Sequence, residues 1–159
     1  MCEYRKNTIN NNMILFFTQD IIFRFNHKRR YSKFFNELAS TYNKRLNDVN
    51  FIFCSDDYLL NINKRFLRHD YCTDVITFDN SSPISFDQIS GDIFISIETV
   101  RFNAKEYGAS SFKEELLRVM AHGLLHLIGY NDGTSKEKTL MRQQEDAVLL
   151  QYNKQFNDY

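Results

Sequence analysis

Two histidines lie four residues apart in an apolar segment, at His122 and His126. On an α-helix this spacing places both imidazoles on one face, one turn apart, where they can bind a single metal ion. Gly129 lets the backbone turn away from the helix, and Asp132 follows three residues later. The pattern H-x-x-x-H-x-x-G-x-x-D therefore predicts a metal site with two imidazole ligands and one carboxylate ligand.

Three protein ligands leave a fourth tetrahedral position for water, which is typical of catalytic rather than structural zinc. Zinc lowers the pKa of bound water to about 7, so the site predicts hydrolysis at neutral pH. The alternative is a pair of core histidines bonded to carbonyl groups, with Asp132 capping the next helix. The zinc-protease pattern H-E-x-x-H has a similar spacing, but Gly123 stands where its general base would be, which disfavours a peptidase.

The segment that carries the histidines is expected to be the central, buried helix. Ser111 and Glu114 form a capping box at its start, and Gly129 ends it. Its apolar residues cover too much of the circumference for a surface helix; they are Leu116, Leu117, Met120, Ala121, Leu124 and Leu125. A second capping pattern at residues 134–137 predicts a last helix.

Strands and helices alternate along the rest of the chain. Apolar periodicity predicts a helix over residues 28–46, and Ser55 can cap another helix that carries Leu59 and Phe66. Runs rich in β-branched and aromatic residues predict strands over residues 49–54, 74–78 and 93–97. The fold class is therefore α/β, an α+β sandwich in which a small mixed β-sheet packs against the central buried helix and flanking helices. The strand order cannot be read from the sequence.

The composition describes one domain. The chain has 159 residues, 43% of them hydrophobic, with only 5 Gly and 1 Pro. We expect a single domain over residues 13–159, preceded by a disordered extension at 1–12 or by a start codon chosen upstream of the true start at Met13. Three widely spaced cysteines indicate reduced thiols and a cytoplasmic protein. No apolar run approaches the length of about 20 residues that a membrane helix requires.

The charge balance gives no general attraction to nucleic acid, because 20 Lys and Arg offset 20 Asp and Glu. Two local clusters are basic: residues 27–30, and Lys64 and Arg65 with Arg68. Either cluster could also be a solvated surface. Binding to a polyanion would therefore depend on local contacts.

Several motifs together resemble one known family. The stretch H-G-L-L-H-L-I-G-Y at residues 122–130 is similar to the signature of the YbeY family of bacterial metal-dependent endoribonucleases, which act in ribosomal RNA maturation. T-D-V-I-T-F at residues 73–78 resembles the family's T-D-V-L-S-F strand, and G-D-I at 91–93 resembles its G-D-I strand. Met141-Arg142 with Glu145 extend the similarity downstream. The resemblance covers about residues 61–146.

The resemblance implies a small α/β fold in which three ligands hold one metal ion, usually zinc, in a cleft facing RNA. Carried over, the ligands are His122, His126 and Asp132. Most members have a third histidine where this chain has Asp132, and a carboxylate is also an acceptable ligand. An arginine considered important to the family's RNase activity aligns with Leu67. Arg65 and Arg68 flank that position, so they are candidates for binding a phosphate, or else solvated charges at a helix end.

The resemblance also implies a function: a single-strand-specific, zinc-dependent endoribonuclease that processes the 3′ end of 16S rRNA and acts in ribosome biogenesis and quality control. Its expected partners are ribosomal RNA and the small ribosomal subunit, with ribosomal proteins or assembly GTPases as further candidates; neither DNA nor a membrane is expected. No catalytic residue is assigned beyond the metal ligands. Two alternatives stay open, a zinc metallopeptidase-like hydrolase and a noncatalytic ribosome-assembly factor with a structural metal.

Overall fold

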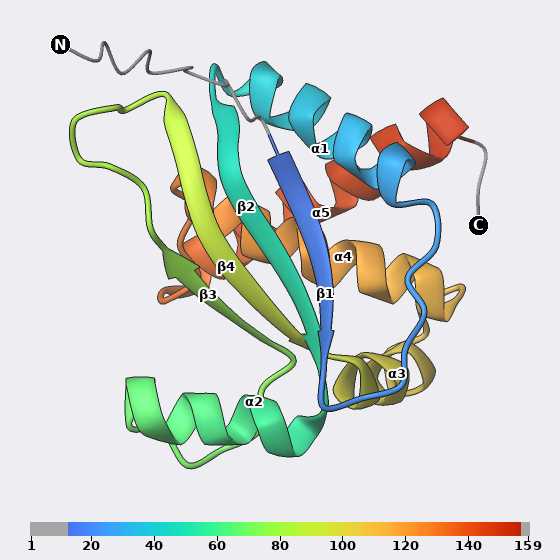
Figure 1. Ribbon diagram of the computed structural model, residues 1–159. Coiled ribbons are helices and arrows are strands. Elements are labelled where there is room, and N and C mark those ends of the chain that lie inside the picture. The colour runs from blue at the N-terminus through green and yellow to red at the C-terminus, as the bar shows by residue number, and fades with distance from the viewer. Residues whose placement is uncertain (1–12, 157–159) are drawn as a thin grey trace, which may run out of the picture.

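A four-stranded mixed sheet forms the centre of the protein in a computed structural model, which describes residues 13–156 (Figure 1). Strands β1 (Met13–Gln19), β2 (Arg45–Cys54) and β4 (Gln88–Ser96) run parallel, and β3 (Val75–Asp79) pairs antiparallel with β4. The order is β1-β2-β4-β3, so β1 and β3 are the two edge strands. The predicted small mixed sheet is confirmed.

Helices cover both faces of this sheet unequally. Their bounds are α1 (Lys28–Thr41), α2 (Asp56–Ile62) with the π-helical turn η1 (Asn63–Leu67) directly after it, α3 (Ile97–Glu106), α4 (Phe112–Ile128) and α5 (Ser135–Phe156). Helices α1, α4 and α5 lie behind the sheet in Figure 1 and share its main hydrophobic core. Helix α2 packs a smaller apolar cluster onto the other face. The α/β class with a central helix and flanking helices is confirmed.

Helix α4 is the buried helix that the sequence predicts. The Ser111 hydroxyl accepts a hydrogen bond from the Glu114 amide at 3.1 Å, and the helix ends at Gly129, whose φ of 122° suits glycine. The Glu114 carboxylate bonds to the Ser110 hydroxyl, a contact that the capping pattern does not predict. Nine of its 17 residues are buried, so its position is fixed by the core rather than by helix propensity.

Several boundaries differ from the sequence prediction, and both β2 and β4 begin earlier than predicted, at Arg45 and Gln88. The first helix ends at Thr41, not at residue 46, because Asn43 adopts a φ of 57° that reverses the chain. Leu46 therefore belongs to β2, where it is fully buried. The strand predicted over 93–97 ends at Ser96, whose hydroxyl caps α3 by accepting from the Thr99 amide at 3.2 Å. Neither helix α3 nor strand β1 was predicted.

Strand β1 begins at Met13, and the single domain expected over residues 13–159 stays a prediction. The extension predicted for residues 1–12 lies outside the described residues. Within residues 13–156, no helix is long and apolar enough to cross a membrane.

Candidate metal centre

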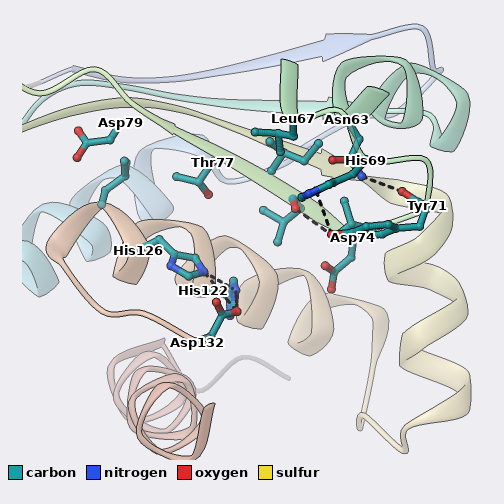
Figure 2. A pocket seen from close by; sticks show the side chains of 14 residues that line it. Asn63, Leu67, His69, Tyr71, Asp74, Thr77, Asp79, His122, His126 and Asp132 are labelled. Atoms are coloured by element: carbon teal, nitrogen blue, oxygen red, sulfur yellow. Dashed lines mark hydrogen bonds and ion pairs between the residues drawn. The ribbon is translucent and has the colours of Figure 1, made fainter. Parts of the chain in front are cut away.

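The three predicted ligands meet at one point. His122 and His126 project from one face of α4, and the turn after Gly129 returns Asp132 toward them (Figure 2). The Nε2 atoms of the two histidines lie 2.9 Å apart, and Asp132 Oδ2 lies 3.4 Å from one and 3.6 Å from the other. This group could therefore hold a metal ion.

Hydrogen bonds set which nitrogen of each histidine faces the centre. His126 Nδ1 lies 2.9 Å from the carbonyl oxygen of Tyr130, and His122 Nδ1 lies 2.7 Å from Glu145 Oε1. A carbonyl or an ionised carboxylate can only accept, so each Nδ1 carries the proton and donates it. Both Nε2 lone pairs are thus left for a metal ion, which is how protein partners orient metal-binding histidines.

The spacing of the three donors suits an ion such as zinc. Ligand atoms at roughly 2.0–2.2 Å from a tetrahedral ion are about 3.4 Å from one another. The separations of 2.9, 3.4 and 3.6 Å lie around this value. Without a metal ion the two Nε2 atoms can share one proton in a hydrogen bond at 2.9 Å, and a bound cation would take the place of that proton. The donor set therefore fits a metal ion.

Opposing effects act on the two imidazoles. Burial lowers the pKa of His122, but its hydrogen bond to Glu145 and the charge of that carboxylate outweigh burial and raise it. Burial and the neighbouring His122 hold the pKa of His126 below its ordinary value. Glu145 is itself only 6% exposed, and Arg118 lies 3.3 Å from its other oxygen. The buried carboxylate thus joins the metal centre to α5.

The centre lies on the wall of a cleft of about 590 Å³ along the outer side of the edge strand β3 (Figure 2). The cleft is bounded by α4, by β3 and by the loop that joins η1 to β3. Asp74, at the end of that loop, also lines it, and burial raises the pKa of this carboxyl although the nearby His122 acts in the opposite direction. Asp74 can therefore hold a proton close to the metal ligands at a higher pH than an exposed aspartate can.

The two predicted phosphate-binding arginines flank the cleft without lining it. Leu67 lies on the cleft wall, whereas Arg65 extends over the ring of Phe66 at 5.3 Å from its centroid. Arg68, with a φ of 56°, is the residue at which the chain leaves η1. A role for Arg65 or Arg68 in substrate binding therefore stays a prediction.

Two functional positions were missed by sequence reasoning. The sequence indicated Glu145 only as part of the resemblance to the family. Its hydrogen bond to His122 Nδ1 could not be predicted, because it depends on how α5 packs against α4. Asp74 precedes β3 and enters the cleft only because β3 is an edge strand beside α4. The only sequence signal for these two positions was that each is a carboxylate inside a motif resembling the family: Asp74 in residues 73–78, and Glu145 after Met141-Arg142.

Comparisons with known proteins agree with this geometry. The family described as Endoribonuclease YbeY matches residues 14–153. Proteins named Endoribonuclease YbeY from Cytophaga hutchinsonii and Flavobacterium psychrophilum are 48% and 44% identical, over 86% and 84% of this chain and 93% and 92% of theirs. A Thermotoga maritima protein solved in solution is 25% identical and superimposes with a TM-score of 0.60, over 91% of this chain and 92% of that one. The chain belongs to the YbeY endoribonuclease family.

Proposed function

We propose that the protein is a zinc-dependent endoribonuclease that hydrolyses phosphodiester bonds of ribosomal RNA. The observation that carries this proposal is the convergence of His122, His126 and Asp132 at an open cleft in a chain of the YbeY family. By family resemblance, its substrate is single-stranded rRNA, including the 3′ end of 16S rRNA, and its place is ribosome biogenesis in the cytoplasm. The small ribosomal subunit, ribosomal proteins and assembly GTPases are the proposed partners.

The ligand set determines what chemistry is available. His122, His126 and Asp132 would hold the zinc ion, which would supply Lewis-acid polarisation of a phosphate and hydroxide at neutral pH. Glu145 and the Tyr130 carbonyl keep the two rings oriented with Nε2 toward the substrate side. Asp74 also lines the cleft, and its raised pKa would let this carboxyl hold a proton there.

The packing of Gly123 argues against a metallopeptidase. A Cβ atom at this position would lie 2.5 Å from Ile93 Cγ2, because α4 is pressed against the sheet. A side chain at position 123 would press against Ile93 of β4 and Thr77 of β3, so a glutamate there does not fit without a shift of the helix or the sheet. The general base of the H-E-x-x-H pattern is disfavoured by space as well as by sequence.

The open cleft favours catalysis over a purely structural metal. Structural zinc is almost always held by four protein ligands in a closed site. Here three protein ligands converge, and the Asp132 side chain is 44% exposed at the cleft. A noncatalytic assembly factor would not need the open position.

Cleavage of a fluorescent single-stranded RNA tests the proposal. Wild-type protein should cleave it, a chelator should abolish cleavage and added zinc should restore it, while casein stays intact. Asp132→Ala should lose cleavage and keep its circular dichroism spectrum, because the removed side chain is partly exposed. Cleavage that survives both the chelator and Asp132→Ala would refute the assignment.

A further inference from the structure

The loop between η1 and β3 has a defined shape because a buried amide holds it. The Asn63 side chain, in a residue that is only 1% exposed, donates from Nδ2 to the carbonyl oxygen of Tyr71 at 2.8 Å. The backbone amide of His69 donates to the carbonyl oxygen of Asn63 at 3.2 Å. Asn63 thus fixes the loop at two points, and a buried polar residue used in this way makes the loop part of the folded structure.

The same loop presents two aromatic rings to the cleft. The rings of His69 and Tyr71 are stacked, with centroids 5.0 Å apart and planes at 21°, and the Tyr71 hydroxyl lies 3.0 Å from His69 Nδ1. Both residues line the metal cleft, as Leu67 does, and all three are exposed (Figure 2). Tyr71, at 58% exposed, therefore offers apolar ring surface to whatever enters the cleft.

The charges of the cleft make such surface important for RNA. Three aspartates line it, Asp74, Asp79 and Asp132, and its described lining contains neither lysine nor arginine. Lysine and arginine supply most of the attraction between proteins and the phosphates of RNA, and this lining offers neither. Much of the affinity for the strand must then come from the metal ion and from contacts to the bases.

We propose that His69 and Tyr71, with Leu67 beside them, form a stacking subsite for one unpaired base next to the phosphate that reacts at the metal centre. This inference rests on the proposed endoribonuclease function. Aromatic side chains commonly bind single-stranded nucleic acid in this way, whatever the base, because every base has a flat face to stack. In a duplex both faces of a base are covered by its neighbours, so the subsite accepts a base only from a single-stranded segment.

The test combines substitutions in the protein with removal of single bases from the RNA. The zinc-loaded enzyme is assayed for kcat/KM on a short single-stranded RNA and on a series of the same RNA with one abasic position each. Tyr71→Ala should lower kcat/KM on the intact RNA by about 5- to 150-fold, the range that base stacking supports. Tyr71→Phe keeps the ring and loses only the hydroxyl that bonds to His69, so it should lose less activity than Tyr71→Ala. The control is Tyr107→Ala, a tyrosine that is 74% exposed outside this cleft.

Coupling between the ring and one base is the decisive result. On the RNA that lacks the stacked base, kcat/KM of the wild-type enzyme should fall to the value that Tyr71→Ala shows on intact RNA. Tyr71→Ala itself should lose little more kcat/KM on that abasic RNA. The hydrogen bond from Asn63 goes to the backbone of Tyr71 and survives the substitution, so the loop should keep its shape. An equal loss for Tyr71→Ala on intact RNA and on every abasic RNA, or no loss at all, would overturn the subsite while leaving the nuclease assignment intact. If wild type cleaves no RNA, the proposed function fails, and the subsite with it.

Discussion

The contact between α4 and the sheet at Gly123 predicts an unusual response to a mild substitution. In the interior of an exposed helix, alanine is more favourable than glycine by about 1 kcal/mol. Gly123→Ala would therefore stabilise α4 if the helix stood alone. In the folded protein the new Cβ would lie 2.5 Å from Ile93 Cγ2 and 3.2 Å from Thr77 Oγ1. Real Cβ atoms essentially never show a contact of 2.5 Å, so Ile93, its strand or α4 must shift.

The size of the effect follows from these two opposing contributions. Overpacking a core typically costs about 1–3 kcal/mol. Ile93 is fully buried and β-branched, so its methyl group cannot rotate away, which places the cost toward the upper end. After subtraction of the helix gain, Gly123→Ala should lower the free energy of unfolding by about 1–2 kcal/mol. For a domain of this size that corresponds to a fall in Tm of about 2–8 °C.

Urea unfolding and thermal melts of the metal-free protein would measure this loss. Gly133→Ala is the matched control, because its Cβ would meet only the end of the Glu137 side chain at 3.4 Å. It should change the free energy of unfolding by less than about 0.5 kcal/mol. Adding Ile93→Ala should relieve the clash, so the double variant should be less destabilised than the sum of the two single variants. A Gly123→Ala protein as stable as wild type, or more stable, would refute the proposed close packing.

Three further predictions concern the metal centre and the thiols. Glu145→Gln removes the charge that orients His122. The affinity for zinc, measured by chelator competition, should fall by about 10- to 100-fold. An unchanged affinity would contradict this role of Glu145. Because the pKa of His122 is raised by its pairing with Glu145, the metal-free protein gains stability from this pair below about pH 6.5 and loses it as pH rises through the folded pKa. Zinc needs the neutral imidazole, so the rise in Tm on adding zinc should grow from about pH 6 to pH 8; a larger rise at the lower pH would oppose this linkage. Burial, together with nearby carboxylates, raises the pKa of Cys54 to about 12. In a Cys2→Ser protein, only the exposed Cys72 should therefore react rapidly with a disulfide reagent at pH 8. Rapid reaction of two thiols per chain would contradict the burial of Cys54.

Local signals in the sequence were enough to predict the centre of the site. His122, His126 and Gly129 lie on one continuous helix and its end, so their relative positions follow from helical geometry alone. The start of that helix at Ser111 also depends on a local hydrogen bond. These features need no knowledge of how distant parts of the chain pack.

The parts that were missed depend on contacts between distant segments. Glu145 reaches His122 across 23 residues of sequence, through the packing of α5 on α4. Leu67 occupies the cleft wall because the π-helical turn directs it there, which residue type alone does not indicate. The first helix was predicted too long because Leu46 continues the helical spacing, whereas the left-handed conformation of Asn43 moves it into β2.

The three-ligand centre is tested most directly by the zinc content of the purified protein, measured by elemental analysis after purification without chelator and incubation with zinc. Wild type should retain one zinc ion per chain, and His126→Ala should retain little, because two ligands bind far more weakly than three. His27→Asn is the control, since His27 is exposed on the surface in a left-handed conformation that asparagine tolerates, and it should match wild type. A wild-type protein that binds no zinc, or a His126→Ala protein that retains a full equivalent, would contradict the centre described above.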